Sequence, residues 1–172
     1  MKHGPRYHVK PRRRREGKTD YRRRLRLLRS KKTRIVVRKS LRNIRVQFIE
    51  YNPDGDRVIA SAISQELKKI YNWKYSVSTT PAAYLTGLLA GKRAKEQGIE
   101  EGVLDIGRQK PTKGSRLFAA MKGVIDAGIK CPHSSEIIPS EDRLLGKHLN
   151  KEITPTVNTI KNKIIGEEGG TK

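Results

Sequence analysis

The sequence lacks the features that mark secreted and membrane proteins. Its 172 residues contain one cysteine, Cys131, so an intramolecular disulfide is impossible and a disulfide-stapled secreted scaffold is excluded. No apolar run approaches the roughly 18 residues of a membrane span. The arginine-rich N-terminus is not followed by the apolar stretch of a secretory signal. We therefore expect a protein of the reducing cytoplasm.

Acidic residues are also scarce relative to basic ones. The chain has 39 Lys and Arg against 17 Asp and Glu, a formal net charge of +22. This excess makes nucleic acid the expected partner, with an anionic membrane surface as the second choice. The hydrophobic fraction of 34% and the mean hydropathy of −0.73 are low but still allow a folded core.

The positive charge is concentrated near the N-terminus. Residues 1–40 carry 18 basic against 2 acidic residues (18 − 2 = +16), and residues 41–172 carry 21 against 15 (+6). We therefore divide the chain into an N-terminal arm (residues 1–33), a globular domain (residues 34–150) and a C-terminal tail (residues 151–172). The arm has too few apolar side chains to offset the entropy of ordering, so we expect it to be disordered until it binds a polyanion. We expect a loosely held tail with a short helix near residues 157–165.

The domain begins with a pattern typical of strands. Three strands are predicted to form an antiparallel meander: residues 34–39, 43–50 and 57–62. Turn signals separate them at residues 40–43 and 52–56. In the third strand, the alternation places Val58, Ala60 and Ala62 on one face.

Helices and a further strand follow the meander. Thr80 is a candidate N-cap with Pro81 at the first helical position, and Gly98 is the expected stop. The other elements expected are a short helix at residues 64–71, a strand at 103–107 and a helix at 115–127. This order predicts an α/β fold with a mixed sheet and packed helices.

Residues with catalytic potential are few. Asp54, Asp56 and Asp105 suggest a metal-dependent nuclease, which remains an alternative. However, Asp54 and Asp56 lie in a turn where Asp is favoured for local hydrogen bonds, and Asp105 at a strand end suits a structural or RNA-orienting role. Cys131 and His133 lack the companion ligands of a zinc site. We expect no enzyme activity, no metal and no cofactor.

The arm carries the clearest chemistry. Arginine's planar guanidinium suits bidentate phosphate contacts, and interleaved tyrosines can stack on unpaired bases. The candidate RNA-binding residues of the arm are Arg6, Tyr7, Lys10, Arg12, Arg13, Arg14, Arg15, Lys18, Tyr21, Arg22, Arg23, Arg24, Arg26, Arg29 and Lys31.

Two further groups extend this candidate surface. The first lies on the first two strands and their hairpin: Arg38, Ser40, Arg42, Asn43, Arg45 and Gln47. The second precedes a helix N-terminus, where free N–H groups favour phosphate: Arg108, Lys110, Lys113 and Ser115. The simpler alternatives are a solvated face for the sheet group and a localisation signal or a solubilising tail for the arm. A DNA-compacting protein remains a further alternative. RNA is favoured over DNA because no helix-turn-helix pattern is found and an arginine-rich arm suits irregular folded RNA.

Several segments, in order, match one protein family. They are residues 4–7, 12–21, 24–27, 37–40 with Asn43, 83–91, 103–107 and 125–128. Over about residues 4–150 the chain resembles the archaeal and eukaryotic form of large-subunit ribosomal protein eighteen. Because the chain stops soon after Asn150, we expect the archaeal form.

The resemblance implies a specific function and fold. It implies binding to 5S rRNA in the central protuberance, attachment of that RNA to the 23S-type rRNA, and contacts with neighbouring large-subunit ribosomal proteins. It implies no DNA or membrane partner. The implied fold is an α/β domain of ribonuclease-H-like topology without catalysis, preceded by an extended basic N-terminal arm.

Overall fold

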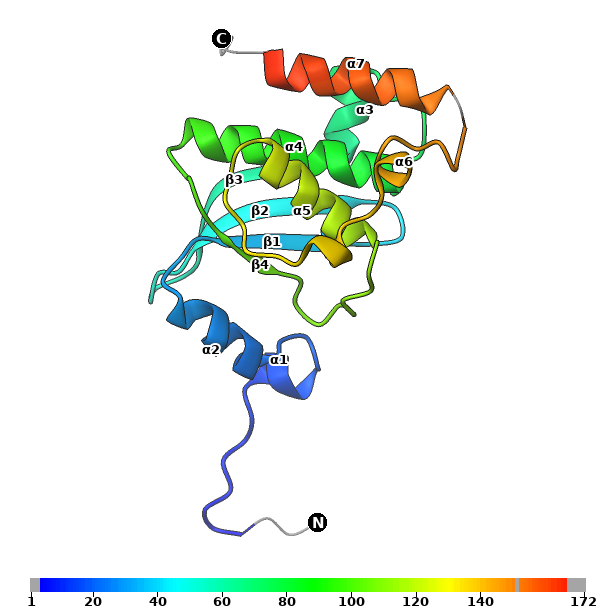
Figure 1. Cartoon of the computed structure of the whole chain (residues 1–172). Coiled ribbons are helices and arrows are strands. Elements are labelled where there is room, and N and C mark those ends of the chain that lie inside the picture. The colour runs from blue at the N-terminus through cyan, green and yellow to red at the C-terminus, as the bar shows by residue number, and fades with distance from the viewer. Residues whose placement is uncertain (1–3, 151, 167–172) are drawn as a thin grey trace.

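A four-stranded mixed sheet forms the centre of the molecule. The computed structural model describes residues 4–150 and 152–166. The strands are β1 (Arg34–Lys39), β2 (Ile44–Glu50), β3 (Arg57–Ile63) and β4 (Val103–Asp105), in the spatial order β3-β2-β1-β4 (Figure 1). β1 is antiparallel to β2 and parallel to β4, and β2 is antiparallel to β3. The predicted α/β class, mixed sheet and meander are confirmed.

One face of the meander differs from the prediction at a single residue. Ala60 and Ala62 are buried opposite Phe48 and Val46, but Val58 is 47% exposed. A register shift at Phe48 pairs Ile49 with Val58, so β3 holds one extra residue there. A bulge of this kind reverses the facing of the residues beyond it, which turns Val58 toward solvent.

Of the seven α-helices in the described residues, the third, fourth and fifth lie close to the predicted positions. In chain order the seven are α1 (Arg12–Arg15), α2 (Tyr21–Arg29), α3 (Gln65–Tyr71), α4 (Thr80–Glu96), α5 (Arg116–Asp126), α6 (Glu141–Leu144) and α7 (Ile153–Gly166), with a 3₁₀ turn at Ser135–Ile137. The N-cap of α4 is Thr79 rather than Thr80, because the Thr79 carbonyl already accepts the amide of Ala83. No helix in the described part of the chain is long and apolar enough to cross a membrane.

Helices α4 and α5 cover one face of the sheet (Figure 1). They approach each other closely, because a Cβ on Gly87 would lie 1.9 Å from the carbonyl oxygen of Ala120 and a Cβ on Gly123 would lie 2.1 Å from that of Tyr84. Helix α4 packs against the sheet, α5 and α7 at once, so most of its circumference is buried. The core therefore lies on this side of the sheet, and the opposite face is free for the arm.

The C-terminal tail is not loosely held, which corrects our expectation. Helix α7 begins earlier than predicted and packs on α4. Its buried residues are Ile153, Val157, Ile160 and Ile164. The spacing of three and four residues forms one apolar stripe, which explains the packing. The Glu- and Gly-rich end, residues 167–172, and residue 151 lie outside the described residues.

The arm is also more structured than its composition predicts. Residues 4–10 form no helix or strand, with a turn closed by the Tyr7 amide and the Gly4 carbonyl, and lead away from the domain; α1 and α2 follow (Figure 1). The Asp20 carboxylate caps α2 by accepting the amides of Arg22 and Arg23 at 3.0 and 3.2 Å. One ion pair and two hydrogen bonds with the domain, described below, supply stabilisation that the arm's own apolar residues cannot. The expectation of an arm without structure of its own is therefore wrong for these helices.

Candidate nucleic-acid interface

The arm and the open face of the sheet enclose a groove of about 1050 Å³, which we call the arm–sheet groove. Val36 and Ile49 of the sheet and Leu27 of α2 give it apolar side chains. Its cations are Arg13, Lys18, Arg23, Arg24, Arg26, Arg34, Arg38 and Arg108, and its acids are Asp20, Asp56 and Asp105. Eight cations against three anions (8 − 3 = +5) make the groove strongly positive.

A buried arginine stands at the inner wall of this groove. Arg34, the first residue of β1, is 3% exposed. Its Nη1 contacts Oδ2 of Asp105 at 3.2 Å and its Nη2 contacts Oδ2 of Asp56 at 2.7 Å. The two carboxylates come from opposite edges of the sheet, one at the end of β4 and one just before β3. Arg34 therefore links both edges through charge-assisted hydrogen bonds.

Asp105 also organises the loop that follows β4. Its Oδ1 accepts the amide of Gly107 at 2.8 Å and the Nη2 of Arg38 at 3.1 Å, while its carbonyl accepts the Nη1 of Arg38 at 2.6 Å. These contacts give Asp105 the structural role that its position at a strand end suggested. Gly107 adopts φ +60°, a left-handed conformation that glycine adopts without strain.

Asp56 is not the local turn residue that the sequence suggested. Its carboxylate accepts Nη2 of Arg24 at 2.9 and 3.0 Å as well as Arg34. The turn is closed instead by Asn52, whose carbonyl accepts the amide of Gly55 and whose side chain accepts that of Asp54. The pairing of Asp56 with Arg24 and Arg34 could not be predicted from the turn's own residues, because both arginines are distant along the chain.

Two acids of the groove, Asp56 and Asp20, have a lowered pKa and stay ionised at neutral pH. Partial burial by itself raises the pKa of Asp56, but the hydrogen bonds and charges of Arg34 and Arg24 outweigh it, so the pKa lies below its ordinary value of 3.8. The hydrogen bond from the Arg23 amide is the main cause that lowers the pKa of Asp20. These carboxylates therefore act as fixed anions that hold arginines in place.

Two more contacts join the arm to the loop after β4. Nη1 of Arg23 donates to the Gly107 carbonyl at 3.1 Å, and Nη1 of Arg108 donates to the Gly17 carbonyl. Arg108 was predicted as an RNA contact, and the structure gives it a bond to the arm as well. Arm and loop thus form one continuous rim of the groove.

The other predicted arm residues lie mostly at the surface. Arg6, Tyr7 and Lys10 belong to the segment before α1, Arg12, Arg13, Arg14 and Arg15 form α1, and Lys18 precedes α2. Helix α2 carries Tyr21, Arg22, Arg23, Arg24, Arg26 and Arg29, and Lys31 follows it with φ +54°. Among these, only Arg24 has a half-buried side chain, in keeping with its ion pair.

The predicted sheet residues divide between structural and exposed positions. Ser40 closes the β1–β2 hairpin, because its Oγ accepts the Asn43 amide at 2.9 Å. Arg38 is committed to Asp105, as described above. Arg42 and Arg45 are exposed, while Gln47 is half-buried on β2.

The predicted loop residues are not all equally available. Lys110 is exposed, whereas Lys113 pairs with Glu136 at 2.8 Å. Ser115 occupies the N-cap position of α5, but its hydroxyl makes no capping hydrogen bond. The strongest case for a phosphate contact in this loop is therefore Lys110.

Arg34 is a residue of the groove wall to which the sequence pattern assigned no role. The strand pattern only places it in β1. The available signal was an arginine opening a run of β-branched residues, since a charge in a buried strand needs a partner.

The described residues do not assemble a metal site. Within residues 4–150 and 152–166, no three His, Cys, Asp or Glu side chains lie together. Burial raises the pKa of the Cys131 thiol to about 11, and His133 Nδ1 contacts the Cys131 carbonyl at 2.7 Å. Where a nuclease would place a metal between carboxylates, Asp56 and Asp105 instead share the guanidinium of Arg34.

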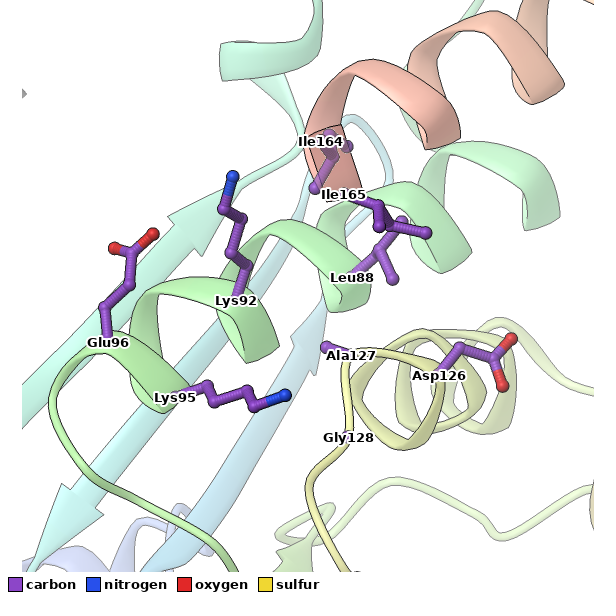
Figure 2. A pocket seen from close by; sticks show the side chains of 9 residues that line it. All are labelled: Leu88, Lys92, Lys95, Glu96, Asp126, Ala127, Gly128, Ile164 and Ile165. Atoms are coloured by element: carbon purple, nitrogen blue, oxygen red, sulfur yellow. The ribbon is translucent and has the colours of Figure 1, made fainter. Parts of the chain in front are cut away.

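A second, smaller hollow lies on the helical side of the molecule. It has a volume of about 500 Å³ and lies between α4, the end of α5 and the last turn of α7 (Figure 2). Apolar side chains of Leu88, Ile164 and Ile165 line it, and its charges balance, with two lysines against Glu96 and Asp126. The arm–sheet groove is therefore the better candidate for binding a polyanion.

Comparison with known proteins gives a consistent result. A family described as "Ribosomal large subunit proteins 60S L5, and 50S L18" matches residues 5–101 and 94–134. The chain is 60% identical to large ribosomal subunit protein uL18 of Korarchaeum cryptofilum, over 87% of this chain and 76% of that protein. It is 56% identical to the uL18 protein of Aeropyrum pernix, over 87% and 70%. Against that of Methanococcoides burtonii it is 47% identical, over 97% and 99%.

Proposed function

The chain belongs to the family of ribosomal large-subunit proteins that comprises 60S L5 and 50S L18, and from this premise we propose that it binds 5S rRNA and helps to attach it to the 23S-type rRNA. The family is a structural component of the large subunit and not an enzyme. The proposed place is the central protuberance of a cytoplasmic ribosome, beside other large-subunit proteins. Neither DNA nor a membrane is a proposed partner.

The observation that carries this proposal is the excess of cations in the arm–sheet groove. Its three acids already accept hydrogen bonds from arginines or from backbone amides. Phosphates entering the groove therefore meet cations that outnumber the anions and are held in defined positions. Fixed guanidinium groups bind phosphate at a lower entropic cost than free side chains do.

The groove also offers a mechanism for recognising folded RNA. Arginines of α1 and α2 would contact backbone phosphates, and Tyr21, which is 38% exposed, would stack on an unpaired base. Arg42 and Arg45 on the sheet and Lys110 on the loop would extend the surface beyond the groove. The segment at residues 4–10, which leads away from the domain, would reach a second RNA, which suits a protein that joins two RNAs.

The strand order supports the topology that the resemblance implies. Strands β1, β2 and β3 form an antiparallel meander. The chain then passes through α3 and α4 to β4, which pairs in parallel with β1. We propose that this arrangement is ribonuclease-H-like. In this chain the arginine between Asp56 and Asp105 takes the place that catalytic magnesium would need, so the nuclease alternative loses its chemical basis.

Binding to purified RNA tests the proposal. We expect the chain to bind a 5S rRNA transcript at least about tenfold more tightly than duplex DNA of equal length at the same salt concentration. Fluorescence anisotropy with labelled RNA measures this ratio. Equal affinities for both nucleic acids would contradict the proposal and favour a DNA-compacting protein. Magnesium-dependent cleavage of the transcript would favour the nuclease.

A further inference from the structure

One carboxylate of the groove contacts both the arm and the domain. Asp56 accepts hydrogen bonds from Arg24 of α2 and from Arg34 of β1. We propose that Asp56 is a positioning residue that docks α2 against the sheet before RNA arrives and thereby strengthens RNA binding, although it is itself an anion. This inference rests on the proposed function, because the ligand is the same RNA.

The geometry makes Asp56 a rigid acceptor. Arg34 is 3% exposed and is held at its other end by Asp105, so it cannot move away from Asp56 without breaking a second ion pair. A carboxylate fixed by a buried guanidinium presents its oxygens to α2 in one orientation. Nη2 of Arg24 contacts both of these oxygens, at 3.0 and 2.9 Å.

The contact leaves Arg24 able to bind phosphate. Its side chain is 32% exposed, and within the described residues its Nε and Nη1 have no hydrogen-bond partner. The guanidinium can therefore hold Asp56 with one nitrogen and a phosphate with the others. Asp56 does not have to be displaced when RNA binds.

The summed charge of this network of ion pairs also favours RNA binding. Arg24, Asp56, Arg34, Asp105 and Arg38 are connected in that order, three cations with two anions (3 − 2 = +1). One positive charge remains uncompensated. A phosphate brings the missing negative charge, so the docked state is electrostatically suited to RNA and is not self-inhibited.

A matched pair of substitutions separates positioning from net charge. Asp54→Asn and Asp56→Asn each raise the net charge by one and lie in the same turn, but Asp54 makes no ion pair in the described part of the chain. If only net charge mattered, both variants would bind 5S rRNA slightly more tightly. We expect Asp54→Asn to do so, whereas Asp56→Asn weakens binding about fivefold, since the docked fraction falls. Equal or tighter binding by Asp56→Asn would overturn the inference.

A measurement without RNA separates this inference from the proposed function. Hydrogen exchange of the α2 amides should accelerate in Arg24→Gln, which leaves the pair between Arg34 and Asp56 intact and so keeps the domain folded. Arg22→Gln is the control, because Arg22 lies on the same helix and its side chain has no partner in the described residues. Asp56→Glu keeps the carboxylate that Asp56→Asn removes, so it should retain the slow α2 exchange and the RNA affinity of the unsubstituted protein. Equal exchange in Arg24→Gln and Arg22→Gln would overturn the docking, whether or not the protein binds 5S rRNA.

Discussion

Two helices near the ends of the chain attach to the same domain by different physics. Helix α2 and helix α7 lie at opposite ends of the molecule in Figure 1. Helix α7 buries four aliphatic side chains against α4, whereas α2 buries no residue and is held by a hydrogen bond from Arg23 and an ion pair from Arg24. The C-terminal helix is therefore part of the hydrophobic core, and the N-terminal helix is an attachment on the open face.

The difference determines what each helix contributes. Burial of aliphatic surface stabilises the fold but leaves little for a partner to contact. Exposed ion pairs contribute little stability, about 1 kcal/mol or less, but keep charged groups at the surface. Changes at α7 should therefore alter stability, and changes at α2 should alter RNA binding.

Removing the arm should have the largest effect on binding. Residues 1–30 contain 13 of the 39 basic residues. We expect their deletion to lower affinity for 5S rRNA about a thousandfold at low salt, and to flatten the slope of log K against log salt concentration by roughly 0.7 for each phosphate that the arm neutralises. Titrations at several salt concentrations measure the slope. The melting temperature should barely change, and an unchanged slope would place the important charges on the domain.

Removing a buried side chain of α7 should have the largest effect on stability. Ile164 is fully buried and the neighbouring Ile165 is 49% exposed. Ile164→Ala should reduce the free energy of unfolding by about 3 kcal/mol, because apolar burial is removed and a cavity is left. Ile165→Ala, the matched control, should change it by less than about 0.5 kcal/mol. Denaturant unfolding measures both, and equal values would mean that α7 is not docked as described.

The buried ion pair between Arg34 and Asp105 tests whether an ionic contact contributes more to stability when it is buried than when it is exposed, as at α2. Asp105→Asn removes the charge that faces Arg34, whose side chain is 4% exposed. We expect the free energy of unfolding to fall by about 2 kcal/mol, because a charged hydrogen bond is weakened where water cannot replace it. Denaturant unfolding is again the measurement. A neutral result would show that Asp56 alone is sufficient to hold Arg34.

Acid should release α2 before it affects α7. Because the folded-state pKa of Asp56 is depressed below 3.8, its contribution is fully present above that pH and disappears as the pH falls through the lower folded value. Docking of α2 should therefore be constant from about pH 5 to 8 and weaken only in strong acid. Amide NMR signals of α2 followed against pH would measure this. Weakening that begins near pH 6 would implicate a histidine instead.

Much of the fold was predictable because local signals agreed with each other. The alternation at Ile44, Val46 and Phe48 specified which face of β2 is buried, and Gly98 and Gly128 end their helices with positive φ as expected. Val58 was misplaced, because a bulge depends on how two strands pair and leaves no mark in the periodicity of one.

Of the candidate site, the sequence specified which residue types would bind but not which of them are already occupied. Arginine content and its concentration in residues 1–40 predicted a polyanion partner, since net charge does not depend on the fold. Sequence did not distinguish Arg38, committed to Asp105, from Arg45, which is exposed.

The order of amino acids was therefore enough to specify the strands and the main helices of the domain, the charge and the family. The folded arrangement was needed to bring Asp56, Arg24 and Arg34 together, to place Arg34 between two carboxylates, and to make α7 complete the core. The physical reason is that helices, strands and net charge arise from neighbouring residues, whereas ion pairs and burial depend on which distant segments the fold brings into contact.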